Sequence, residues 1–165
     1  MFKENNLQTR MYVAYRIGND LFASRSVEVR KILDVKSIQN SGGISNFIQV
    51  NNLEIPVLNL YNRLNQENIT NNESKSVIIL KVSFRETYSL IGLLVDELVS
   101  LFEVYDSKLQ MNPLVDEFYY TDYIEGYYNY KNTVLKLINI KKLIDTDDSV
   151  IIRAWNKKRK LVLVN

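Results

Sequence analysis

Residues 88–104 read Tyr-Ser-Leu-Ile-Gly-Leu-Leu-Val-Asp-Glu-Leu-Val-Ser-Leu-Phe-Glu-Val. Two apolar runs, 88–95 and 98–104, are too short for ordinary helices and are rich in β-branched, aliphatic and aromatic residues. Such composition is typical of strands. The charged pair Asp96-Glu97 separates the runs, so this stretch predicts two consecutive strands.

The same format of short strands around a polar turn recurs toward the N-terminus. Residues 11–23 surround Gly18-Asn19-Asp20, and residues 47–58 surround Asn51-Asn52. Gly, Asn and Asp tolerate a positive φ, which tight hairpin turns require. Both stretches therefore predict β-hairpins. Pro56 predicts an edge strand or a bulge in the second hairpin, because proline cannot donate to a ladder.

Helical spacing is rare in the chain. Only residues 138–144 show it, with apolar residues at 140, 143 and 144 on one face. Many short strands with so little helix predict a mainly β fold built from barrels. The remaining predicted elements are a helical turn at 27–29, strands at 30–38, 77–82, 123–128 and 133–137, and a turn at 129–132.

A polar connector at residues 65–76 has the composition of a surface loop. It divides the predicted strands into two comparable sets, so we expect the joint between two subdomains there. One domain then spans residues 10–148. Residues 149–165 form a C-terminal extension, for which both a helix and a hairpin remain open.

Composition excludes several kinds of chemistry. The chain contains no Cys and no His, which excludes disulfides, thiolate nucleophiles and imidazole bases or ligands. The acidic groups at 116–117 and 145–148 lack the spacing of a calcium loop. We therefore expect no metal site, no cofactor and no enzymatic activity.

Charge and hydropathy bear on partners and location. The net charge is only +2, so no global field attracts nucleic acid or a membrane. Basic residues do gather around Trp155 in the segment 153–160, which is either a nucleic-acid contact or an exposed turn or helix face. The chain lacks an apolar run of roughly 18 residues and a signal-peptide pattern, so we expect a cytoplasmic protein.

The ordered motifs resemble those of the CheW family of chemotaxis coupling proteins over residues 12–144. Residues 91–99 are similar to the family's V-G-L-V-V-D-x-V segment, and residues 123–126 to its Y-I-x-G segment. Weaker similarities are the opening hairpin at 12–22, the V-x-E-I strand at 27–32, V-P-I-V-D-L at 55–60, and the last strand and helix at 133–144.

This resemblance implies two intertwined five-stranded SH3-like β-barrels with a few short helices. It also implies a non-enzymatic scaffold that couples chemoreceptors to the histidine kinase CheA. In the family, a groove between the barrels binds the helical receptor tip, and other barrel surfaces meet the regulatory domain of CheA. The expected location is the cytoplasm, at membrane-associated receptor arrays. A non-flagellar, surface-motility array is an alternative setting.

The resemblance assigns receptor contacts to seven positions. Two departures from the family pattern fall among them, because Lys31 replaces an acid and Asn51 replaces the arginine of N-L-R-G. An asparagine cannot form the forked contact that arginine makes to a carboxylate. The four apolar candidates could instead be ordinary residues of the barrel core. Asn51 could instead be a residue of a plain hairpin turn. The seven candidates are Val29, Lys31, Ile32, Asn46, Asn51, Val77 and Ile78.

Overall fold

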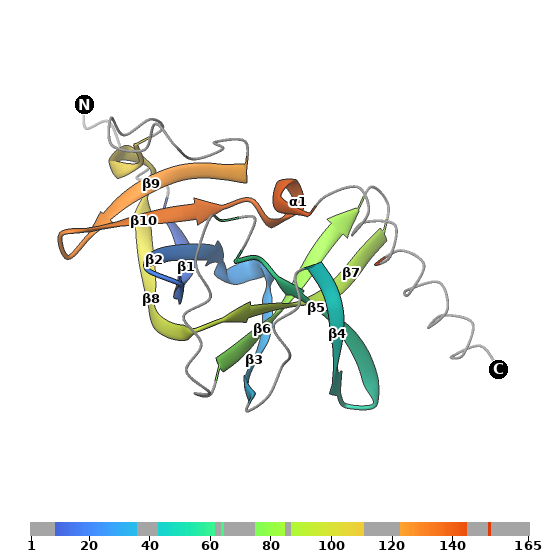
Figure 1. Ribbon diagram of the computed structural model, residues 1–165. Helices are drawn as coiled ribbons and strands as arrows, with labels where there is room; N and C mark the ends of the chain where they lie inside the picture. Colours follow the sequence, from blue (N-terminus) through green and yellow to red (C-terminus); the bar gives the residue numbers. More distant parts are fainter. Residues whose placement is uncertain are drawn as a thin grey trace.

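A computed structural model of the chain is shown in Figure 1. It describes residues 9–35, 43–61, 64, 75–84, 87–110, 123–144 and 152.

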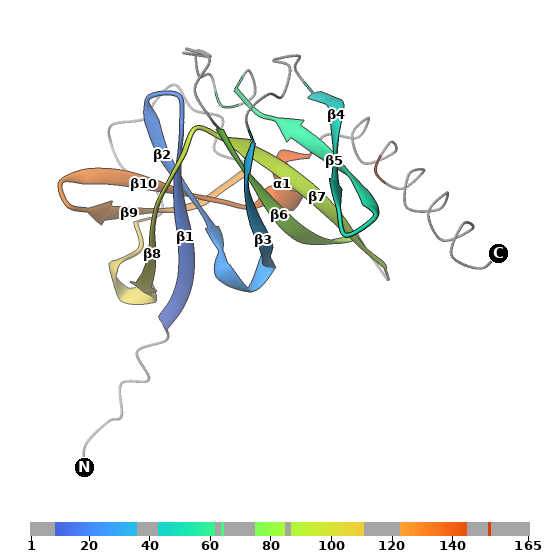
Figure 2. The ribbon, with the colours of Figure 1, turned by 90° about the horizontal axis from the view of Figure 1, so that it is seen from below.

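The described residues form two curled five-stranded sheets (Figures 1 and 2). Sheet A has the strand order β8 (Glu97–Tyr105), β1 (Thr9–Ile17), β2 (Asp20–Arg25), β10 (Thr133–Ile138), β9 (Ile124–Tyr130). Sheet B has the order β3 (Val29–Val35), β6 (Lys75–Phe84), β7 (Thr87–Val95), β5 (Leu53–Asn59), β4 (Gly43–Val50). The short helices are η1 (Ser26–Glu28), η2 (Asp106–Lys108) and α1 (Ile140–Leu143). The prediction of a mainly β chain with two five-stranded units is confirmed.

The two sheets repeat one arrangement of strands. Each contains an antiparallel hairpin, β1–β2 or β6–β7, whose second strand pairs in parallel with β10 or β5 respectively. A second hairpin, β9–β10 or β4–β5, completes each sheet at one edge. Sheet A takes its strands from both sides of sheet B in the sequence, so the barrels are intertwined.

The chain crosses between the sheets at places that we did not expect. It passes from sheet A to sheet B at η1, and returns at Asp96 between β7 and β8. The expected joint at residues 65–76 lies mostly outside the described residues, and β5 and β6 on either side of it belong to the same sheet. The polar connector therefore does not separate the sheets, because β6 and β7 fill the middle of sheet B.

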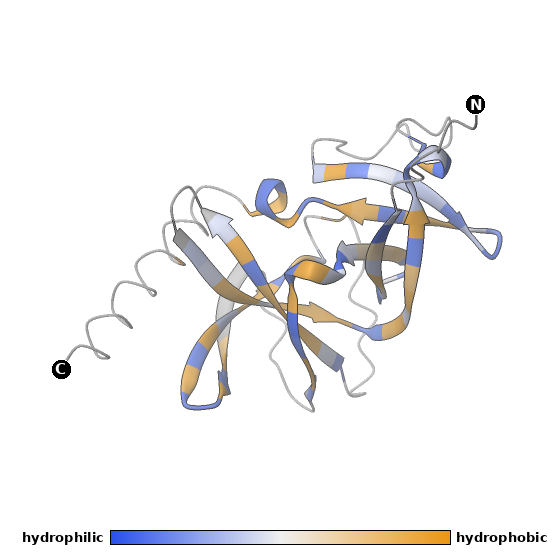
Figure 3. Cartoon of the chain, turned by 180° about the vertical axis from the view of Figure 1, so that it is seen from behind, coloured by the Kyte–Doolittle hydropathy of each residue, from blue (hydrophilic) through white to orange (hydrophobic). Residues whose placement is uncertain are grey.

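The hairpin turns agree with the sequence chemistry. Gly18 has φ 62°, and Asn51 and Asn52 have φ 49° and 64°. These turns are confirmed. The turn predicted at 129–132 is shorter, because β9 continues to Tyr130 and only two residues, with φ 46° and 62°, reverse the chain. In Figure 3 the tips of the β4–β5 and β9–β10 hairpins are hydrophilic.

Pro56 does not mark an edge strand. β5 lies between β7 and β4, so that part of the prediction is wrong. The strand accommodates the proline because its ladder with β7 begins only at Val57, so no β7 residue is paired with Pro56. Pro56 itself is paired with Phe47 of β4. The ladder does bulge nearby, between Ile44 and Asn46 of β4.

The remaining boundaries shift by a few residues. The helical turn expected at 27–29 is η1, and the strand expected at 30–38 begins at Val29 and is described to Val35. The helix expected at 138–144 is α1, whose apolar face is buried as predicted at Ile140, Leu143 and Ile144. Within the described residues no helix has the length and apolarity to span a membrane.

The apolar core has two parts. The larger cluster lies between the sheets and includes Tyr15 and Phe22 of sheet A packed with the β5, β6 and β7 side chains of sheet B. The smaller cluster fills sheet A, where the Phe102 ring of β8 lies 5.9 Å and 5.6 Å from the Tyr128 and Tyr130 rings of β9. These ring contacts bring the two edges of sheet A together.

Gly92 of β7 is enclosed by side chains of neighbouring strands. A Cβ atom there would lie 2.8 Å from Val77 Cγ1 and 3.1 Å from Val57 Cγ2. We expect Gly92→Ala to lower the free energy of unfolding by about 1–3 kcal/mol through overpacking. Adding Val77→Ala removes the closer methyl group, so the double variant should lose less than the sum of the single losses.

Urea unfolding of the four chains measures this coupling. Gly126→Ala is the matched control, because the nearest atom to its added Cβ is at 3.4 Å, an ordinary contact distance. Strictly additive losses at Gly92 and Val77 would show that the close approach does not limit this site.

Candidate functional site

The edge strand β3 and the preceding η1 present a mixed basic and apolar surface. Val27 is 74% exposed and Ile32 is 38% exposed, and the side chains of Arg30 and Lys31 are also exposed. We call these four residues the β3 edge. Within the described residues β3 pairs only with β6, so it is an edge strand of sheet B.

A bulge explains why the consecutive β3 residues Arg30 and Lys31 are both exposed, and the ladder is regular again from Lys31 onward. Val29 is paired with Leu80 and Lys31 with Ile79, so Arg30 is the extra residue. A bulge interrupts the strict alternation of faces along a strand. Val29 is half-buried and packs against the larger core cluster, whereas Lys31 and Ile32 are placed where a partner can reach them.

Two of the predicted receptor contacts belong to the core instead. Val77 and Ile78 of β6 are fully buried. For them the core interpretation applies, because β6 lies inside sheet B and both of its faces are covered. They lie beside β3 in the sheet, since Ile78 is the register partner of Ile32 and Val77 that of Leu33.

The remaining two candidates lie at the other end of sheet B. Asn46 is on β4, in register with Val57. Asn51 is exposed in the β4–β5 turn, where its positive φ suits asparagine better than arginine. β3 and β4 are the two edge strands of sheet B (Figure 2). Because Val77 and Ile78 are buried, the seven candidates do not form one exposed surface.

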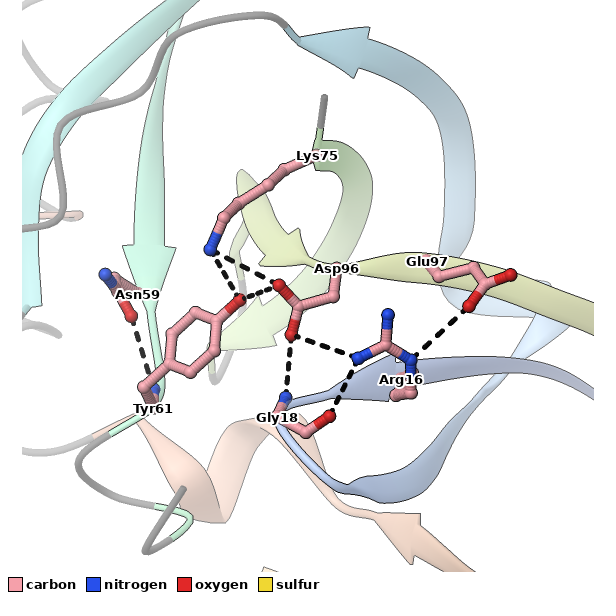
Figure 4. A network of polar contacts seen from close by, with 7 residues as sticks. All are labelled: Arg16, Gly18, Asn59, Tyr61, Lys75, Asp96 and Glu97. Atoms are coloured by element: carbon pink, nitrogen blue, oxygen red, sulfur yellow. Dashed lines mark hydrogen bonds and ion pairs between the residues drawn. The ribbon is translucent and has the colours of Figure 1, made fainter. Parts of the chain in front are cut away.

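A polar network occupies the junction between the sheets (Figure 4). Asp96 Oδ2 accepts a hydrogen bond from the Gly18 amide at 2.7 Å and lies 4.0 Å from the Arg16 guanidinium. Asp96 Oδ1 accepts from the Tyr61 hydroxyl and lies 3.3 Å from Lys75 Nζ. The Lys75 and Asp96 side chains are each 12% exposed, so the ion pair is well shielded from water.

The outer members of this Asp96 network hold its donors in place. Asn59 Oδ1 accepts from the Tyr61 amide at 3.2 Å, and Glu97 accepts from Arg16 Nε at 3.3 Å. Burial, together with the adjacent Asp96 carboxylate, raises the pKa of the Tyr61 hydroxyl. Tyr61 therefore stays a neutral donor at physiological pH, and the network is suited to structural positioning.

A second charged cluster lies at the other crossover. The Arg25 guanidinium makes a forked contact to Glu125, at 3.2 Å and 2.9 Å. Glu28 of η1 is nearby, and its Oε2 is buried without a hydrogen-bond partner among the described residues. Burial raises the pKa of the Glu28 carboxyl, against the opposing effect of Arg25, and Glu125 adds to the rise.

We expect the free energy of unfolding of Glu28→Gln to rise, relative to that of the unmodified chain, as the pH increases from the ordinary pKa of a glutamate through the higher folded-state pKa of Glu28. Because the folded-state pKa of Glu28 lies above its unfolded value, its stabilising contribution is complete below the unfolded pKa. That contribution is lost as the pH rises through the folded-state pKa of Glu28 and the buried carboxyl group ionises. Glutamine has no ionisable group, so the variant keeps its stability over this range. Urea unfolding at several pH values measures the difference. Glu103→Gln, at an exposed position on β8, is the control, and a pH-independent difference would contradict the prediction.

The described residues hold no group of three or more potential metal-ligating acidic side chains. The C-terminal basic segment considered as a nucleic-acid contact lies outside them, and of residues 149–165 only Ile152 is described.

Comparison with protein-family models gives a match to the CheW-like domain over residues 11–148. The chain belongs to the CheW-like domain family. The crystal structure of the scaffolding protein TtCheW from Thermoanaerobacter tengcongensis matches with a TM-score of 0.70 and 16% sequence identity. The match covers 86% of this chain and 96% of that chain. It confirms the predicted fold of two SH3-like barrels. A search of curated proteins gave no match.

Within this CheW-like domain, Asp96 belongs to the motif at residues 91–99 that indicated the family. The motif did not indicate that Asp96 is the centre of a polar network between the sheets. Its partners Gly18, Tyr61 and Lys75 are distant in the sequence, so no spacing rule connects them. The available signal was a carboxylate directly after the buried run that ends at Val95. A buried charge requires partners, although their identity requires the fold.

Proposed function

We propose that this chain is a non-enzymatic scaffold that couples chemoreceptors to the histidine kinase CheA in bacterial chemotaxis signalling. The family match over residues 11–148 carries the proposal. The chain also lacks Cys and His, which removes cysteine nucleophiles and the commonest general base. In this proposal the protein works in the cytoplasm, at receptor arrays attached to the membrane.

Within this proposal the β3 edge is the receptor-facing surface. Lys31 and Ile32 are consecutive exposed residues of an edge strand, and the resemblance assigns both to receptor contact. Asn46 and Asn51 then belong to a separate contact at the β4–β5 hairpin. The proposed surface no longer includes Val77 and Ile78, because a partner cannot touch side chains that are fully buried.

Titration with receptor cytoplasmic fragments and with the CheA regulatory domain tests the proposal. We expect Lys31→Glu combined with Ile32→Ala to weaken receptor binding by about fivefold or more, as for a loss of roughly 1 kcal/mol. Binding to CheA should be unchanged. Lys141→Glu, at an exposed position on α1, is the matched control. Failure of the unmodified chain to bind either partner would refute the proposed function.

The departures at Lys31 and Asn51 favour a receptor class different from that of standard coupling proteins, such as one in a surface-motility array. Both are exposed at positions that the family assigns to receptor contact, and interface residues select the partner within a shared fold. Binding should therefore be tighter to one receptor class in a panel than to receptors of flagellar chemotaxis. Equal binding across the panel would contradict this preference.

A further inference from the structure

The two carboxylate oxygens of Asp96 are divided between the two sheets. Oδ2 faces sheet A, where it contacts the Gly18 amide of the β1–β2 turn and the Arg16 side chain of β1. Oδ1 faces sheet B, where it contacts Lys75 at the start of β6 and Tyr61, which follows β5. One side chain thus bridges two barrels that are packed together mainly through apolar contacts.

The backbone at Asp96 reinforces this bridge. The Asp96 amide donates to the Arg16 carbonyl at 2.9 Å, and the Arg16 guanidinium donates to the Gly18 carbonyl at 2.9 Å. The end of β1 and the β1–β2 turn in sheet A are therefore hydrogen-bonded to Asp96, the residue that directly follows β7 of sheet B. Charge-assisted hydrogen bonds such as those of Asp96 are stronger and geometrically stricter than neutral ones.

At the other crossover the forked contact between Arg25 of β2 and Glu125 of β9 lies within sheet A and does not join the two sheets. At η1 the Glu28 Oε2 atom has no hydrogen-bond partner among the described residues, and neighbouring Val27 is 74% exposed. A well-satisfied buried polar group specifies one arrangement, whereas an unsatisfied one does not. Of the two crossovers, Asp96 is the one that can define an orientation.

We propose that Asp96 fixes the relative orientation of the two barrels, with each carboxylate oxygen holding one sheet. Apolar contacts between the sheets are non-directional and permit small rotations. The Asp96 network selects one of these orientations, so surfaces on different barrels keep a constant geometry. This positioning role is independent of which partners the surfaces bind.

Distance measurements between paired spin labels test the proposal. The chain has no cysteine, so Ser83→Cys on β6 and Glu103→Cys on β8 provide unique labelling sites, both exposed and on different sheets. We expect one narrow distance distribution in the otherwise unmodified chain. Asp96→Asn keeps one acceptor oxygen and places an amide donor toward the other sheet, so the distribution should become at least about twofold wider.

Val57→Ala is the control for a general loss of stability, because it enlarges the core of sheet B without touching the network. Its distribution should stay narrow. An unchanged width in Asp96→Asn, or equal widening in Val57→Ala, would overturn the proposal. Should Asp96→Asn fail to fold, the double variant Tyr61→Phe with Lys75→Met removes only the sheet B donors. The same twofold widening is expected there, and an unchanged width again overturns the proposal.

Discussion

Asp96→Ala is expected to lower the free energy of unfolding by about 3–5 kcal/mol, the range for breaking a buried ion pair by removing one partner. The substitution leaves the shielded Lys75 ammonium without its carboxylate. It also leaves the Tyr61 hydroxyl and the Gly18 amide without the acceptor they now share. Each uncompensated polar group adds a desolvation penalty to the lost Coulomb attraction.

Urea unfolding of the full chain measures this loss. Glu97→Ala is the matched control, because the neighbouring Glu97 side chain is 62% exposed and forms a surface pair with Arg16. We expect its effect to stay below about 1 kcal/mol. A loss of similar size in both variants would mean that the Asp96 pair contributes no more than an ordinary surface interaction.

Ile152→Ala is expected to lower the free energy of unfolding by about 2–5 kcal/mol, as for other buried isoleucines. Ile152 is 1% exposed and belongs to the larger core cluster, although it lies beyond the family match that ends at residue 148. Ile152, the described residue of the C-terminal extension, is therefore part of the larger core cluster.

Two comparisons make this second prediction specific. The same substitution at Ile32, which is 38% exposed, should have a much smaller effect because little apolar surface is lost from the core. Removing residues 149–165 should destabilise the domain at least as much as Ile152→Ala. An unchanged midpoint of unfolding after this truncation would contradict a core role for Ile152.

Local chemistry predicted the hairpins and the amphipathic helix well. The turn at Asn51-Asn52 is defined by residues that accept a positive φ, so two positions suffice to recognise it. The same rule missed the exact turn at Lys131-Asn132, because lysine rarely adopts this conformation. The buried face of α1 followed from the spacing of Ile140, Leu143 and Ile144 alone.

Strand pairing and burial were harder to infer from the sequence. Residues 76–80 of β6 are all buried, so the strand has no polar face from which alternation can be read. That is why Val77 and Ile78 were candidates for both core and surface. The joint exposure of Arg30 and Lys31 depends on a bulge in the β3–β6 ladder, and the Asp96 network depends on residues brought together only by folding.

The division of sheet A across the sequence has a consequence for how the chain folds during synthesis. All five strands of sheet B lie between Val29 and Val95, whereas Leu21 of β2 must find Leu135 of β10. Contacts between such distant residues carry a large loop-closure entropy and form late. As the chain leaves the ribosome, all strands of sheet B are available before β10 is synthesised. Until then the β1–β2 hairpin lacks its partner strand β10, and its apolar side chains are not fully covered. The nascent protein is most vulnerable to aggregation during that interval.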